Sequence, residues 1–341
     1  MKREEWGWLA GGLAAGSAVS FAVGRRRAGG RPAVPEARPR AAEGPLVSDE
    51  QLAADLAYVE GGLRPARVDG WTTAIFDRGE GEAVVCIPIL AHVEVIYARQ
   101  LRDLGRDHRA ITYRRPEATD HPVGIAERAE EVRQLLDHLG LERAHIVGRG
   151  EGAIVAAAFA HTHPERCRSL VMISLGMDHK VPPVPLTNAL NWALLHLPIE
   201  GRLLTDESWR HKVVNYLSGR DQRLTAAQVE GIYRRIPDFI KVCKYSVTPL
   251  VLYHDLRGKA QRIAVPTLLI TTDEDPRATR ADLEELAAAL PDCRGVHVLP
   301  YGGRFVNYIQ GDATNRLIRE FYAALEADRR AVAPAGARAA G

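Results

Sequence analysis

Residues 66–327 alternate between short apolar runs and segments with helical periodicity, and this alternation constrains the fold more than any other feature of the sequence. Several runs are apolar almost without interruption, which is typical of strands covered on both faces of a sheet. The sequence predicts strands at 67–77, 83–88, 109–113, 144–147, 169–174, 266–271 and 295–299. It predicts helices at 93–104, 123–139, 151–162, 280–290 and 312–327. The expected class is therefore α/β, with a mostly parallel, doubly wound sheet.

Residues 176–262 interrupt this alternation and are predicted to form a separate layer. The interval is mostly helical in pattern, carries Leu, Trp and Tyr, and begins with a proline-rich stretch at 181–185. An insertion of this kind predicts a helical cap over the strand ends. The core is then formed by residues 47–175 and 263–327, and Ser48-x-x-Gln51 is a capping box that opens a first helix.

A glycine-rich turn between a predicted strand and a predicted helix carries the clearest motif, Gly148-Arg149-Gly150-Glu151-Gly152. The turn resembles the nucleophile elbow of the α/β-hydrolase fold. Residues 263–276 resemble the acid strand and loop of that family, 297–306 its histidine loop, and 88–90 its oxyanion turn. The four segments follow one another in the family's order, and the resemblance implies the α/β-hydrolase fold with an inserted helical cap.

The same resemblance places residues without the family's chemistry at most of its functional positions. The nucleophile position holds Gly150, which has no side chain, and the histidine position holds Arg304, which stays protonated and cannot act as a general base. Asp275 retains the acid position, and Pro88-Ile89 replaces the His-Gly of the oxyanion turn. Triad hydrolysis needs a nucleophile and a base in contact, so no catalytic residue is assigned.

The residues expected to line a ligand pocket share a place at the predicted carboxyl ends of the strands: Ile89, Leu90, His92, Gly150, Glu151, Asp275 and Arg304. Two arrangements of Arg304 stay open. It forms a bidentate pair with Asp275, or it points into the pocket, where the helix that begins near Glu151 also favours an anion. A small apolar or anionic ligand, or a protein partner, is expected, and the sequence implies no cofactor and no metal site.

The sequence leads to the expectation of a membrane-anchored pseudoenzyme of the α/β-hydrolase fold that lacks Ser-His-Asp hydrolase activity. Two alternatives remain open. The first is a lyase or isomerase that uses the same pocket for positioning and electrostatics. The second is a hydrolase with a relocated nucleophile.

The expected anchor is the uncharged segment 6–23, which as a helix would span roughly 27 Å. Tryptophans stand at one end and Arg25–Arg27 at the other, and the excess of arginine after the segment places the main domain in the cytoplasm. A cleaved signal peptide, with export of the domain, and an amphipathic helix are the alternatives. The segment is rich in glycine and alanine and is only weakly hydrophobic.

The overall charge excludes a nucleic-acid partner. The chain of 341 residues carries 45 Lys and Arg against 43 Asp and Glu, a net charge of +2, and nucleic-acid binders are usually far more basic. The surplus of positive charge lies before residue 45. Residues 1–24 are assigned to the anchor, and residues 25–46 to a basic linker rich in proline. Residues 328–341 are expected to be a disordered tail.

Overall fold

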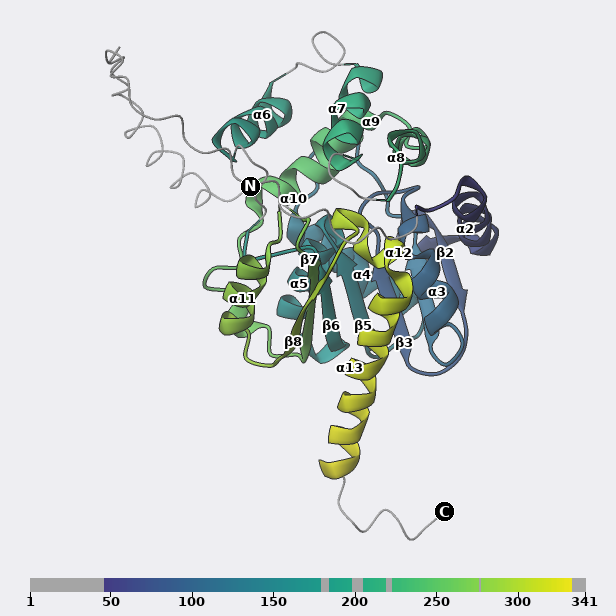
Figure 1. Cartoon of the computed structure of the whole chain (residues 1–341), viewed down its shortest axis with the longest axis vertical. Coiled ribbons are helices and arrows are strands. Elements are labelled where there is room, and N and C mark those ends of the chain that lie inside the picture. The colour runs from purple at the N-terminus through teal and green to yellow at the C-terminus, as the bar shows by residue number, and fades with distance from the viewer. Residues whose placement is uncertain (1–45, 179–183, 198–204, 219–222, 276, 333–341) are drawn as a thin grey trace, which may run out of the picture. The chain divides into compact units, whose positions relative to one another are not determined.

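The computed structural model describes residues 46–178, 184–197, 205–218, 223–275 and 277–332 (Figure 1). Its strands are β1 (Leu63–Val68), β2 (Trp71–Arg78), β3 (Ala83–Ile87), β4 (Arg109–Tyr113), β5 (Ala144–Arg149), β6 (Cys167–Ile173), β7 (Thr267–Thr272) and β8 (Cys293–Leu299). The helices that flank the strands are α2 (Asp49–Gly62), α3 (Ala98–Leu104), α4 (Ile125–His138), α5 (Glu151–Thr162), α11 (Arg280–Ala289), α12 (Val306–Ile309) and α13 (Gly311–Val332).

The strands form one sheet in the order β1-β2-β4-β3-β5-β6-β7-β8. The six strands in the order β4-β3-β5-β6-β7-β8 pair in parallel. At one edge, β2 pairs antiparallel with both β4 and β1. The predicted α/β class with a mostly parallel sheet is confirmed. Parallel strands bring their carboxyl ends to one edge of a sheet, so the loops after β3, β5, β6 and β7 meet there.

The predicted single strand 67–77 is instead a hairpin. Asp69 and Gly70 both have positive φ, +38° and +92°, and the strands on either side pair from Leu63↔Phe76 to Val68↔Trp71. An Asp-Gly pair with positive φ at both positions is the two-residue turn that matches the twist of the flanking strands. The prediction took the turn for strand because apolar residues continue on both sides of it.

Two apolar clusters cover the two faces of the sheet. Val147 packs in a cluster with Leu101 of α3 and Ile318 of α13, while its neighbour Ile146 packs with α4, α5 and α11. Successive strand residues point to opposite faces of the sheet, so each apolar run contributes side chains to both clusters. This explains why the strands read as continuously apolar.

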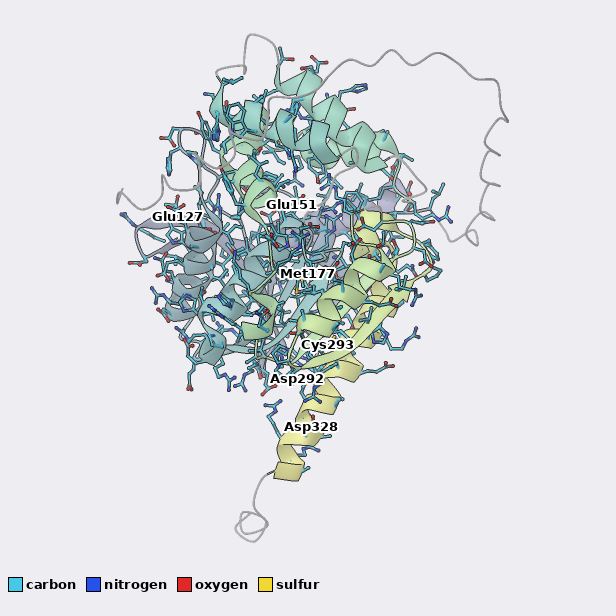
Figure 2. The ribbon with its side chains drawn as sticks, turned by 90° about the vertical axis from the view of Figure 1, so that its left-hand side faces the viewer. Glu127, Glu151, Met177, Asp292, Cys293 and Asp328 are labelled. Atoms are coloured by element: carbon cyan, nitrogen blue, oxygen red, sulfur yellow. The ribbon has the colours of Figure 1, made fainter. Side chains whose placement is uncertain are left out.

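The segment predicted as a cap contains α6 (Val184–His196), α7 (Asp206–Ser218), α8 (Ala226–Tyr233), α9 (Phe239–Val242), a π-helical turn (Cys243–Val247) and α10 (Thr248–Tyr253). Figure 2 shows Glu151, the first residue of α5, beneath these helices. Val229 of α8 packs in the same apolar cluster as Val147 of β5. The cap therefore lies over the edge of the sheet where the strands end.

The C-terminal helix ends later than the sequence predicts. Helix α13 continues to Val332, past the predicted start of the tail at 328, because Leu325 still packs on the core. At the other end, the predicted anchor 6–23 lies outside the described residues.

No helix within the described ranges is long and apolar enough to cross a bilayer. The predicted single-pass localisation with a cytoplasmic domain therefore has no spanning helix to support it among these residues. It rested on a segment whose glycine and alanine content gives little of the transfer free energy that a spanning helix needs.

Candidate active site at the Gly150 turn

The turn between β5 and α5 is built around Gly150, whose φ is +54° and ψ is −122°. Its N–H donates to Ile173 O of β6 at 2.9 Å, and its carbonyl accepts from Ala153 N at 2.9 Å. A side chain at this backbone conformation is strained, whereas glycine adopts it freely. The flanking glycines allow close packing, since a Cβ at Gly152 would lie 2.4 Å from Ile87 O at the end of β3.

Arg304 fills the space in front of Gly150. It lies in the short turn Gly303–Phe305 that leads into α12, and its side chain is 2% exposed. A Cβ built on Gly150 would lie 2.5 Å from Arg304 Nη2. The guanidinium therefore occupies the place that any side chain at position 150 would take.

Glu151 is the carboxylate nearest to this guanidinium. Its Oε2 lies 3.3 Å from Arg304 Nη2, and its Oε1 lies 3.2 Å from Arg277 Nη1. Asp275 Oδ1 lies farther away, 3.9 Å from Arg304 Nη1. The bidentate Asp275–Arg304 pair suggested by the sequence is thus replaced by an ion pair with Glu151 and one longer contact with Asp275.

Asp275 follows β7 and is 1% exposed. Its Oδ1 accepts a hydrogen bond from Arg277 N at 2.9 Å, and its own N–H donates to Thr272 O at 3.2 Å. Its Oδ2 is buried and has no hydrogen-bond partner in the part of the chain that the structure describes. One oxygen of a buried carboxylate is therefore open to a donor that the protein itself does not supply.

Arg149, which sequence reasoning did not assign to the site, is the second buried arginine there. It is 1% exposed, its Nε donates to Arg304 O, and its guanidinium lies 4.6 Å from the ring centre of Phe305. Burial, and after it the charge of Arg304, lowers the pKa of Arg149 to about 10. Its Nη2 has no partner within the described ranges. An arginine at the end of an otherwise apolar strand was the signal that could have identified it.

Ser174, directly after β6, is a further polar residue beside the turn that the sequence analysis missed. Its φ is +56°, which is uncommon for a residue with a side chain. Its N–H donates to Ile270 O at 2.9 Å, and its buried hydroxyl has no partner among the residues described. Nothing in the local sequence predicts this conformation.

The predicted oxyanion turn lies close by but contributes differently from expectation. Ile89 and Leu90 are 3% exposed and pack in the apolar cluster on the cap side. Ala91 N donates to Glu117 Oε1 at 2.7 Å, so this amide is already engaged. His92 has a φ of +67°, and the charged groups that act on its pKa are not those at the Gly150 turn.

Burial, followed by the charge of Arg114, lowers the pKa of His92, and the other charged groups acting on it include Glu60 and Arg235. The structure therefore brings Gly150, Glu151, Asp275 and Arg304 together and leaves His92 with a different charged cluster. No group of three or more His, Cys, Asp and Glu in the described part of the chain is placed to hold a metal ion.

Comparison with known proteins assigns the family. The sequence model of the alpha/beta hydrolase fold matches residues 101–308, more than half of the chain. This chain belongs to the α/β-hydrolase fold family, as the resemblance implied. The assignment of Gly150 to the family's nucleophile position stays a prediction.

Curated relatives and solved structures agree with this assignment. A 2-hydroxy-6-oxononadienedioate/2-hydroxy-6-oxononatrienedioate hydrolase of Comamonas testosteroni is 29% identical over 269 residues, which cover 72% of this chain and 90% of the relative. The putative carbamate hydrolase RutD of Caulobacter sp. (strain K31) is 26% identical over 216 residues, 63% of this chain and 78% of the relative. The enol-lactonase of Burkholderia xenovorans LB400 superposes with a TM-score of 0.58 at 22% identity, covering 76% of this chain and all of that one.

These relatives correct the function predicted from the sequence. They are named hydrolases, which contradicts a membrane-anchored pseudoenzyme and equally the alternative of a lyase or isomerase. The prediction inferred inactivity from the residues at the nucleophile, histidine and oxyanion positions of the resemblance.

Proposed function

We propose that this protein is a hydrolase of small carboxylate-bearing acyl compounds and that a water molecule, activated by Asp275, is its nucleophile. The observation that carries the proposal is the buried Oδ2 of Asp275, which lacks a partner within the described residues while the neighbouring Oδ1 lies 3.9 Å from Arg304 Nη1. A carboxylate with one free oxygen beside a fixed cation is suited to general-base catalysis. The hydrolase class of the relatives supports the reaction type.

The chemistry balances with water as the only co-reactant. Asp275 Oδ2 accepts a proton from water while the water oxygen attacks the acyl carbon. The acyl oxygen gains negative charge, which Arg304 stabilises as a hydrogen-bond donor in a site shielded from solvent. The bond to the leaving group then breaks, and the proton passes from Asp275 to that group. Gly150 is needed in this scheme because any larger residue would displace the guanidinium.

The charges around the turn favour a substrate with a carboxylate. Arg149, Arg277 and Arg304 face two carboxylates, Glu151 and Asp275. Arg149 Nη2 is buried with no partner in the described ranges, and a substrate carboxylate would supply the acceptor that this donor lacks. The name of one relative specifies a dioate, which carries two carboxylates.

Access to the site requires movement. Asp275, Arg149 and Arg304 are each at most 2% exposed, so a substrate reaches them only when the covering segments shift. Gating by segments over a buried site is common in enzymes and often limits the turnover rate.

Hydrolysis of mono-p-nitrophenyl succinate, which carries a free carboxylate, tests the proposal against p-nitrophenyl butyrate, which does not. The wild-type protein is expected to hydrolyse the succinate ester preferentially, and Asp275→Asn is expected to lose the activity. Asp292→Asn changes a half-buried residue that pairs with Arg294 away from the site and is expected to retain the activity. Equal rates for Asp275→Asn and wild type would refute the role of Asp275.

A fluorophosphonate probe distinguishes water from a side-chain nucleophile. The proposal predicts no covalent labelling and full activity in Ser174→Ala. Labelling at Ser174 together with loss of activity in Ser174→Ala would replace the water mechanism by one with a hydroxyl nucleophile.

A further inference from the structure

A charged cavity lies at the opposite end of the sheet from the Gly150 turn. It has a volume of about 270 Å³ and is lined by Arg143, His145, Arg168, Pro266, Arg294, Leu325, Asp328 and Arg329. These residues stand at the starts of β5, β6, β7 and β8 and on the last turns of α13. Figure 2 shows Asp292 and Asp328 at this end of the molecule and Glu151 beneath the cap. Strand β5 runs from the cavity to the Gly150 turn, a separation of roughly 17 Å.

The carboxylates near the cavity are already engaged by cations. Glu82 accepts hydrogen bonds from Arg329 at 2.6 and 3.0 Å and forms an ion pair with Arg168 at 3.2 Å, and its Oε2 lies 3.1 Å from His145 Nε2. The hydrogen bonds from Arg329 are the main reason that the pKa of Glu82 is lowered to about 2. On the other side, Arg294 is held by Asp292 and Asp328.

Two arginines retain donors that these carboxylates do not reach. Arg143 makes no ion pair with any described carboxylate, and its Nη2 donates only to the carbonyl of Cys167, at 3.1 Å. Arg168 Nε is buried and has no partner in the parts of the chain described. Four arginines therefore face three carboxylates, and the excess positive charge lies on the side of Arg143 and Arg168.

His145 adds no charge to the cavity. It is 1% exposed, and burial lowers its pKa to about 4, so the ring is neutral near pH 7. The ring also lies over Tyr322, with 4.1 Å between the ring centres. Together with Pro266 and Leu325, the ring gives the cavity an apolar wall between the guanidinium groups.

We propose that this cavity binds a phosphate monoester of a small organic group, with the phosphate between Arg143 and Arg168 and the organic group against Pro266 and Leu325. Guanidinium donors match phosphate oxygens, and two of them suit the nearly two negative charges of a phosphate monoester near pH 7. The volume exceeds that of a phosphate group alone and approaches the lower end of small-molecule sites. The site is separate from the proposed active site and does not depend on its function.

Titration calorimetry of the full chain with phenyl phosphate tests this inference. The wild type is expected to bind it saturably, and inorganic phosphate, which cannot use the apolar wall, is expected to bind more weakly. The double variant Arg143→Gln/Arg168→Gln is expected to lose at least tenfold in affinity. Arg234→Gln/Arg257→Gln removes two exposed arginines that pair with Glu230 and Asp178 and is expected to leave binding unchanged, which controls for the loss of two positive charges.

Two further measurements keep the result unambiguous. If the double variant fails to fold, Arg143→Gln alone, at an exposed position, is expected to weaken binding at least threefold. Asp275→Asn is expected to leave binding unchanged, because it alters only the site at the other end of β5. Absence of saturable binding in the wild type, equal binding by Arg143→Gln, or loss of binding in Asp275→Asn would each overturn the proposal.

Discussion

Arg304 Nη2 lies 2.5 Å from the position that a Cβ atom of residue 150 would occupy. Glycine at 150 is therefore sterically matched to arginine at 304. The two residues are far apart in the sequence, since Glu151, the next residue after Gly150, precedes Arg304 by 153 positions. The pairing places a permanent cation at the end of β5, between Glu151 and Asp275. The match with Arg304 also accounts for a glycine, rather than a residue with a side chain, at this turn.

Replacing Gly150 by alanine is expected to destabilise the fold by about 2 kcal/mol, because the new methyl group meets Arg304 and the positive φ becomes strained. Urea denaturation measures the change. Gly231→Ala is the matched control, since a Cβ there meets nothing within 4 Å and alanine is the better residue inside α8. A variant Gly150→Ala as stable as the wild type would show that Arg304 moves aside without cost.

Breaking the ion pair at the site is expected to be costly. Glu151→Gln removes the carboxylate that faces both Arg277 and Arg304 and is expected to lower the free energy of unfolding by about 3 kcal/mol, since it removes a negative charge from a buried ion-pair cluster. Glu326→Gln, which breaks an exposed pair with Arg330, is expected to cost less than about 0.5 kcal/mol. Similar effects of the two substitutions in thermal or urea unfolding would contradict this account.

Stability is expected to fall as the pH drops from about 6.5 to about 4. Burial lowers the pKa of His145 to about 4 from the ordinary value of 6.5, so in this window the unfolded chain binds a proton that the folded chain does not. Above pH 6.5 the two states bind equally and His145 contributes no slope. Urea unfolding of His145→Gln between pH 7 and 4 is expected to show a flatter pH profile than His121→Gln, an exposed control. Parallel profiles would exclude His145 as the cause.

The sequence predicted elements whose signals are local. Helix α5 spans residues 151–162 as predicted, because the Gly150 turn precedes it and His163-Pro164 follows it. The sequence likewise predicted Ser48 as the N-cap of α2, and Ser48 Oγ accepts a hydrogen bond from Gln51 N at 3.1 Å. The Asp69-Gly70 turn was missed because its neighbours on both sides favour strands.

What the sequence could not supply are relationships between distant segments. Gly150, Asp275 and Arg304 were named as site residues from their resemblance to family positions. The preference of Arg304 for Glu151 over Asp275 depends on how the turn before α12 approaches the start of α5, which no local pattern encodes. The positive φ of Ser174 likewise arises from the packing of β6 between its neighbours.

The comparison of Asp275→Asn with the wild type, assayed for hydrolysis of mono-p-nitrophenyl succinate alongside a fluorophosphonate labelling experiment, tests the central claim most directly. The account predicts that wild-type protein releases p-nitrophenol without being labelled and that folded Asp275→Asn does not release it. Hydrolysis that persists in Asp275→Asn, or a wild-type protein that hydrolyses neither ester, would contradict it.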